Sequence, residues 1–149
     1  EHTFEDLFVG QKVTFSEKID ESLLIDFAKL SGDFNPLHMD EDYALSTNFE
    51  KRVCHGMLLA SFFSQLVGMY LPGKNSLYFS QSLNFRNPCF IGDEVTIEGE
   101  ITEKKSNTKI ITIKTMAEHV MEPGVRRDPE TGLFYPKFIQ LLTLNNKEL

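Results

Sequence analysis

The sequence predicts an α+β protein in which an antiparallel sheet packs against one long buried helix. The run 56–71 is apolar on almost every side, so a helix formed by it must be surrounded by protein. Several stretches rich in β-branched and aromatic residues follow it, with turn residues between them. Strands joined by short turns are antiparallel, and such a sheet can cover a single helix with one face.

The length and composition favour one domain. The chain has 149 residues, of which 41% are hydrophobic, which suffices for one core and is too short for two ordinary domains. We therefore expect a single domain over 1–149, with an atypical C-terminal loop and strand region over about 119–149. The run 56–71 is shorter than the roughly 20 residues of a membrane-spanning helix and contains Ser61, Ser64 and Gln65. No membrane partner is expected.

The charge balance and the cysteines indicate which partners, disulfides and metal sites are not expected. Lysine and arginine number 15 against 22 acidic residues, for a net charge of −7, and no basic block occurs, so no nucleic acid partner is expected. Cys54 and Cys89 stand among apolar neighbours and form neither a disulfide framework nor a metal-ligand spacing. Buried free thiols in a reducing compartment favour a cytoplasmic location. The histidines show no metal-ligand pair either, and no metal is expected.

The elements before the long helix are short. Residues 12–17 alternate as a strand does. Asp20 or Ser22 can cap a helix that Gly32 can end in a left-handed conformation. Residues 43–49 form a second short helix or an irregular cover segment.

The elements after the long helix are strands. Pro72 and Gly73 stop the helix. Strands are expected over 77–85, 94–103 and 109–118, with turns at 87–88, 92–93 and 105–107, and another strand over 134–144 after a polar loop. Such a sheet has open edges that invite pairing with a second copy of the chain, so we expect a homodimer.

One turn places an acid and a base close together. Residues 31–38 read Ser-Gly-Asp-Phe-Asn-Pro-Leu-His. Pro36 fixes its own φ and moves Asn35 toward an extended conformation, so the chain turns where Asp33 and His38 stand. A carboxylate and an imidazole held this close can share and activate one water. The alternative is that Asp33 and Asn35 only form the turn and His38 is a structural histidine.

Three segments carry a resemblance to a known family. They are 31–38, the helix start Val53-Cys54-His55-Gly56-Met57-Leu58-Leu59-Ala60-Ser61, and the turn Pro88-Cys89-Phe90-Ile91-Gly92-Asp93-Glu94-Val95. Together they resemble the MaoC-type hydratases, the hot-dog-fold family of (R)-specific enoyl-CoA hydratases, over about 4–115. The resemblance implies the hot-dog fold and the reversible hydration of trans-2-enoyl-CoA to (R)-3-hydroxyacyl-CoA, with no cofactor.

The resemblance also implies roles for individual residues. Asp33 and His38 would be the catalytic pair, and Asn35 would fix the loop or contact the same water. The backbone N–H of Gly56 would bind the thioester oxygen, and Ser64 would face the active-site end of the helix. Gly56 and Ser64 stand two steps of four residues apart, which places them on one side of a helix.

The expected chemistry suits the start of the long helix. Addition of water to C3 puts negative charge on the thioester oxygen, and a helix N-terminus offers unpaired N–H groups and a partial positive charge. Gly56 lets a ligand approach the backbone closely. Asp33 and His38 would hold the water, remove one proton and return one to C2. Which of the two transfers which proton does not follow from the sequence.

Other residues receive weaker assignments. His55 is expected to make a structural contact near the helix start, and nothing near Cys54 in sequence would make it a nucleophile. Arg52, Lys74 and Arg86 could reach CoA phosphates, although exposed cations are common.

Three other functions remain open. A dehydratase acting on carrier-protein thioesters would want a basic surface, which the net charge of −7 does not favour. A thioesterase would explain the loop of Asp33 and His38 less well. A non-catalytic acyl-CoA-binding protein would typically have lost one member of this pair. The charged loop over 119–133 departs from the short family members and leaves the acyl-chain length open.

Overall fold

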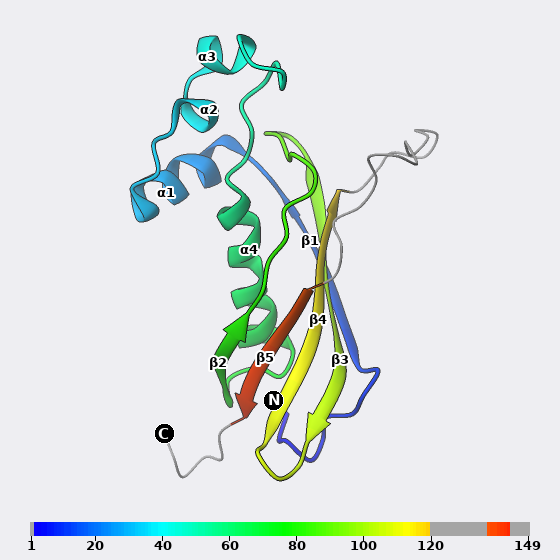
Figure 1. Cartoon of the computed structure of the whole chain (residues 1–149). Helices are drawn as coiled ribbons and strands as arrows, with labels where there is room; N and C mark the ends of the chain where they lie inside the picture. The colour runs from blue at the N-terminus through cyan, green and yellow to red at the C-terminus, as the bar shows by residue number, and fades with distance from the viewer. Residues whose placement is uncertain (1, 120–136, 144–149) are drawn as a thin grey trace, which may run out of the picture.

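A single sheet and one long helix dominate the structure, a computed structural model that describes residues 2–119 and 137–143. Its elements are β1 (Lys12–Lys18), α1 (Glu21–Ser31), α2 (Pro36–Met39), α3 (Glu41–Leu45), α4 (Gly56–Gln65), the π-helical η1 (Leu66–Tyr70), β2 (Ser76–Gln81), β3 (Glu94–Lys105), β4 (Ile110–His119) and β5 (Lys137–Thr143). Figure 1 shows α4 along one face of the sheet and α1, α2 and α3 beyond one end of it. The predicted α+β class is confirmed.

The sheet is antiparallel, but its strand order differs from a simple meander. The five strands follow the order β1-β3-β4-β5-β2, and each neighbouring pair is antiparallel. The sequence suggested that β2 leads by short turns into β3, and this is wrong because β2 pairs with β5. The predicted strand over 77–85 ends at Gln81, and residues 82–93 carry the chain to the start of β3 at the end where α1–α3 gather (Figure 1).

The core lies between α4 and the middle of the sheet. Burial alternates along β3, because successive side chains of a strand point to opposite faces. The principal core side chains of the helix and of β3 and β4 are Leu58, Leu59, Phe62, Phe63, Leu66, Val95, Ile97, Ile101, Ile111 and Ile113. A Cβ built on Gly99 of β3 would lie 2.8 Å from Leu66 and 3.3 Å from Ile113. The helix therefore approaches the sheet as closely as a glycine allows.

The apolar helix is buried on one side only, contrary to the expectation that protein surrounds it. Met57 is 56% exposed and Met69 is 74% exposed. Ser61, Ser64 and Gly68 are exposed as well, so 57, 61, 64 and 68 form one open stripe along the helix. In the described residues, no helix is both long enough and apolar enough to cross a membrane.

The smaller predicted elements are present with shifted ends. Asp20 caps α1 by accepting a hydrogen bond from the Leu23 N–H at 2.9 Å, and Gly32 ends it with a φ of 79°. The helix expected over 43–49 starts earlier, at Glu41, because Asp40 caps it. Residues 137–143 of the strand expected over 134–144 form β5, and the rest of that C-terminal region lies outside the described residues.

Replacing Gly99 with alanine should destabilise the fold. The added methyl group would displace the fully buried Leu66, and overpacking of this kind costs about 1–3 kcal/mol in the free energy of unfolding. Urea unfolding followed by circular dichroism measures this change. Gly68→Ala is the matched control, because nothing lies within 4 Å of the added Cβ. Equal stability of the Gly99 variant and the wild type would contradict the close contact.

Candidate active site

The acid of the site stands on the turn that ends α1. The Gly32 N–H donates to the carbonyl oxygen of Ala28 at 2.8 Å. The backbone N–H of Asp33 then donates to Ser31 Oγ at 3.2 Å, and that of Asn35 donates to Asp33 Oδ1 at 3.2 Å. These local hydrogen bonds hold one carboxylate oxygen of Asp33 in the turn. The side chain remains 49% exposed.

Asn35 begins a short helix that the sequence did not predict. It is extended, with φ −53° and ψ 131°, as the following proline requires. Its Oδ1 accepts a hydrogen bond from the Leu37 N–H at 2.9 Å, and Pro36 fills the first helical position, where no N–H is needed. The motif is thus a turn followed by α2, and α2 carries His38. The contacts described for Asn35 fix the loop.

His38 is oriented by a hydrogen bond to a distant part of the chain. Its Nδ1 lies 2.6 Å from the carbonyl oxygen of Val53, which can only accept, so Nδ1 carries a proton, and in the neutral imidazole Nε2 has the free lone pair. His38 Nε2 lies 4.0 Å from Asp33 Oδ2, beyond direct hydrogen-bond distance. That separation leaves room for one oxygen atom to contact both groups.

His55 lies beside this pair and makes the structural contact near the helix start that the sequence predicted. Its ring centroid lies 3.9 Å from that of His38, and its Nε2 lies 3.0 Å from the carbonyl oxygen of Asp33. The residue is only 2% exposed. Its place directly before Gly56, at the start of the predicted helix, is the sequence signal that could have indicated its closeness to Asp33 and His38.

The ligand atoms of Asp33, His38 and His55 lie within 4.8 Å of one another, a grouping that also invites comparison with a metal site. Sequence spacing did not indicate it, because tertiary contacts bring the histidines together. His55 Nε2 is already engaged by the Asp33 carbonyl oxygen, and the two imidazole rings face each other. Their lone pairs therefore do not converge on one point as metal ligands do. The arrangement suits proton transfer better than ion binding.

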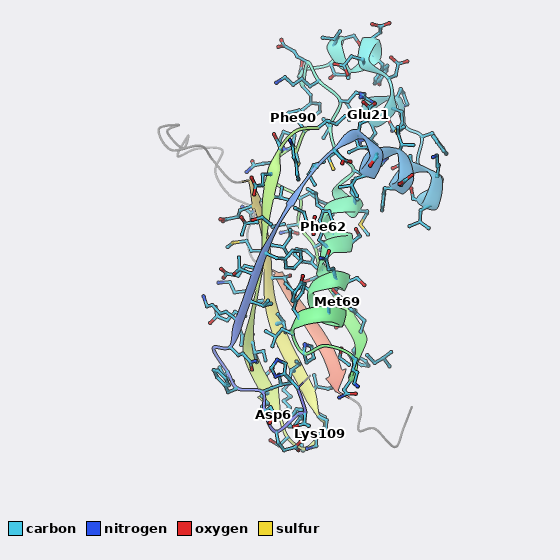
Figure 2. The ribbon with its side chains drawn as sticks, turned by 180° about the vertical axis from the view of Figure 1, so that it is seen from behind. Asp6, Glu21, Phe62, Met69, Phe90 and Lys109 are labelled. Atoms are coloured by element: carbon cyan, nitrogen blue, oxygen red, sulfur yellow. The ribbon has the colours of Figure 1, made fainter. Side chains whose placement is uncertain are left out.

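The start of α4 meets His38 across a cavity of about 370 Å³. His38, Gly56, Met57, Phe85 and Arg86 are among the residues that line it. Figure 2 places Glu21 and Phe90 near this end of the molecule, where α1–α3 lie, and Asp6 and Lys109 at the opposite end. The first turn of α4 directs N–H groups with no intrahelical partner toward this end of the helix.

Gly56 has a packing reason to be glycine. A Cβ at this position would lie 2.9 to 3.2 Å from three ring atoms of Phe85. Phe85 therefore packs directly on the backbone at the helix start, in the loop between β2 and β3. Any side chain at 56 would displace the ring and reshape the cavity.

Ser64 lies apart from the other residues that the sequence grouped with it. It stands on the exposed stripe of α4, about 12 Å along the helix axis from Gly56 at 1.5 Å per residue. Like Asp33 and Asn35, it is not among the residues that line the cavity of His38 and Gly56, but unlike Asp33 it has, in the described residues, no contact with His38 to bring it there. Within the chain, the structure thus brings Asp33, His38 and Gly56 to one end and leaves Ser64 beyond it.

The two cysteines are buried free thiols, as predicted. Both line the cavity, and the Cys54 N–H donates to the carbonyl oxygen of Cys89 at 2.6 Å. A hydrogen bond with Cys54 and burial raise the pKa of the Cys89 thiol. This thiol stays protonated at neutral pH and is a poor nucleophile.

Comparison with known proteins identifies the family. A family model described as "MaoC like domain" matches residues 6–122. The chain belongs to this MaoC-like family. It is 50% identical over 111 residues to an (R)-specific enoyl-CoA hydratase of Aeromonas caviae, covering 74% of this chain and 83% of the relative. A Rhodospirillum rubrum protein of the same name is 44% identical over 114 residues, covering 76% and 79%.

A solved structure supports the same assignment for the fold. The (R)-hydratase of A. caviae, described as involved in PHA biosynthesis, superposes on this MaoC-like chain with a TM-score of 0.82. The sequence identity is 40%, and the match covers 95% of this chain and 99% of that one. The predicted hot-dog fold is confirmed.

The thiols should react slowly in the native protein. Burial keeps a reagent from both thiols, and the raised pKa of Cys89 leaves little thiolate at that residue, so an aromatic disulfide reagent at pH 7 should label the native chain at least about ten-fold more slowly than the unfolded chain. Absorbance of the released thiolate measures the rate, and guanidinium-unfolded protein gives the total of two thiols. Rapid labelling of one thiol in the folded protein would contradict this description.

Proposed function

We propose that this protein is an (R)-specific enoyl-CoA hydratase that adds water to trans-2-enoyl-CoA and gives (R)-3-hydroxyacyl-CoA in a reversible reaction. The observation that carries the proposal is the 4.0 Å approach of His38 Nε2 to Asp33 Oδ2, beside a cavity that also reaches the start of α4. The relatives that are 50% and 44% identical and bear the name of this activity support it.

The acid–base step follows from the hydrogen bonds of the pair. A water between Asp33 and His38 donates one hydrogen bond to Asp33 Oδ2 and the other to His38 Nε2, the unprotonated nitrogen. As the water oxygen bonds to C3, the π bond between C2 and C3 breaks and one water proton passes to the pair. The pair then returns a proton to C2. Acid–base assistance of this kind typically contributes about 10²–10⁴-fold in rate.

The start of α4 stabilises the charge that develops. The electrons of the broken π bond move to the thioester oxygen, which becomes an enolate oxygen. In the proposed complex the Gly56 N–H donates to this oxygen, assisted by the partial positive charge of the helix N-terminus. One such preorganised donor is worth about 3–4 kcal/mol in the transition state. The proposed reaction needs no metal and no organic cofactor.

Cationic side chains near the cavity could bind the phosphates of the acyl-CoA substrate. Arg86 lines the cavity, so it is the best placed of the three candidates for the CoA phosphates. Arg52 is held by Glu21 at 2.7 Å and by Glu41 at 3.0 Å, and its guanidinium is committed to these carboxylates. The net charge of −7 favours CoA over an acidic carrier protein as the thioester carrier.

We also propose that the chain is one domain over 1–149, works in the cytoplasm and forms a homodimer. β2 is an edge strand, and an open edge pairs readily with a second chain. Its Leu77 is 51% exposed and its Phe79 is 63% exposed. Together with the exposed Met57 and Met69 of the long helix, these side chains form an apolar surface that a second copy would bury. The free thiols support a reducing compartment.

Asp33→Asn or His38→Gln should lower hydration of crotonyl-CoA at least about 10²-fold, because each removes one of the two proton acceptors. Loss of the enoyl thioester absorbance measures the rate, and chiral analysis of the product gives its configuration. Asp26→Asn is the matched control, since Asp26 is an exposed carboxylate of α1 with a side chain 75% exposed. Full turnover in either site variant would remove that residue from the mechanism.

The wild-type assay separates the competing functions. Formation of (R)-3-hydroxybutyryl-CoA supports the hydratase. Release of free CoA would indicate a thioesterase instead. Crotonyl-CoA left unchanged would favour the carrier-protein dehydratase or the non-catalytic binding protein.

Light scattering at micromolar concentration should give twice the chain mass. Leu77→Lys and Phe79→Lys should shift the protein toward monomer, because each places a charge on the apolar edge. Leu30→Lys is the control, since Leu30 is 85% exposed on α1 and away from this edge. A monomeric wild type would overturn the proposed assembly.

A further inference from the structure

His55 is the residue that connects the two halves of the proposed active site. Through its side chain it contacts the loop of Asp33 and the ring of His38. Through its backbone it caps α4, and its carbonyl oxygen accepts from the N–H groups of Leu58 at 3.1 Å and Leu59 at 3.4 Å. The residue after it is Gly56, the proposed oxyanion donor.

The hydrogen bond to Asp33 fixes the tautomer of His55. The carbonyl oxygen of Asp33 can only accept, so the nitrogen 3.0 Å away, Nε2, carries the proton. In the neutral imidazole the other nitrogen, Nδ1, is then an acceptor. It is buried and has no hydrogen-bond partner.

An unpaired buried acceptor lowers stability. A leucine or phenylalanine at 55 would fill the same space without this cost. Packing alone therefore does not explain a histidine in this place. The feature that only the histidine supplies is the Nε2–H that the Asp33 carbonyl oxygen accepts.

Ring contacts hold the imidazole of His55 in position. Its centroid lies 3.9 Å from that of His38, with 34° between the planes, and 5.1 Å from that of Phe27 on α1. The side chain is thus fixed between the helix that ends at the Asp33 turn and the ring of the proposed base. A movement of His55 would move both groups of the pair.

We propose that His55 is a positioning residue of the active site. Its Nε2–H holds the Asp33 carbonyl oxygen and its ring supports that of His38, so that Asp33 Oδ2 and His38 Nε2 keep the separation of 4.0 Å. The inference rests on the hydratase function proposed above. It assigns His55 no contact with substrate.

Three substitutions of His55 separate the donor from the packing. His55→Gln places an amide N–H near the position of Nε2 and keeps the hydrogen bond to Asp33. His55→Asn carries the same amide on a shorter side chain that does not reach. His55→Phe keeps the ring contacts without any donor. Thermal unfolding of each variant sets the temperature below which all of them are folded.

The kinetic readout is the division between kcat and KM for crotonyl-CoA. We expect kcat to fall about 10²-fold in His55→Asn and His55→Phe with KM little changed, because misplacement by about 1 Å acts on the transition state. His55→Gln should recover most of the lost kcat. Wild-type kcat in His55→Asn and His55→Phe, or an equal loss in His55→Gln and His55→Asn, would overturn the inference.

A second measurement is independent of activity. Nitrogen-15 spectra of the imidazoles in the wild type should show the proton on Nε2 of His55 and on Nδ1 of His38. A proton on Nδ1 of His55 would overturn the inference even in an active enzyme. If the wild type does not hydrate crotonyl-CoA, the proposed function fails, and these spectra still decide whether the hydrogen bond to Asp33 exists.

Discussion

The close packing on β3 of the long helix, where α4 continues into η1 at Leu66, is the constraint on which the rest of the molecule depends. Gly99 leaves just enough space for Leu66, so the helix axis lies as near the sheet as a backbone without a side chain permits. That contact sets the depth of the helix against the core. It also sets the position of its N-terminus, which faces the cavity beside His38. A helix displaced from the sheet would carry Gly56 away from the acid–base pair.

A short extended segment, 53–55, directly before α4, makes the hydrogen bonds that connect this helix to His38 and to the turn of Asp33. The Val53 carbonyl oxygen orients His38, the Cys54 N–H binds the Cys89 carbonyl oxygen, and His55 binds the Asp33 turn. Each of these three consecutive residues therefore makes at least one long-range hydrogen bond, and the Val53 N–H makes a second one to the carbonyl oxygen of Leu37 at 3.2 Å. The acid–base loop is exposed and held by local turns, so its geometry relative to α4 depends on these bonds. This explains how an exposed carboxylate can be held in place without a buried ion pair.

The three polar side chains of the site differ in their exposure to solvent. Asp33 is half exposed, His38 is mostly covered and His55 is fully buried. Because exposure falls from Asp33 to His38 to His55, the carboxylate of Asp33 is accessible to water while the two imidazole rings are held by their neighbours. Gly56 at the α4 N-terminus lines the cavity beside His38, and preorganised dipoles such as those of a helix N-terminus need no rearrangement during a reaction.

The sequence by itself determined the α+β class, the helix that begins at Gly56, the turn at Gly32 and the pairing of an acid with a base at Asp33 and His38. These features follow from local rules: a left-handed glycine, a proline that fixes its φ, and an apolar run that forms a helix with one side packed on the sheet. The short helix α2 was missed although its signals, an Asn cap and a Pro at the first position, are also local. The spacing of Asp33 and His38 does not fit one face of a helix, so the sequence indicates a turn without a helix.

Only the tertiary structure decided which distant residues meet. The pairing of β2 with β5, the contact of Phe85 with Gly56 and the hydrogen bond of His55 to the Asp33 carbonyl oxygen all join residues far apart in sequence. No periodicity encodes such contacts, because they depend on where the sheet and helix place their ends. Local propensity determines the helices, strands and turns of this protein, and tertiary packing determines the distances between their residues.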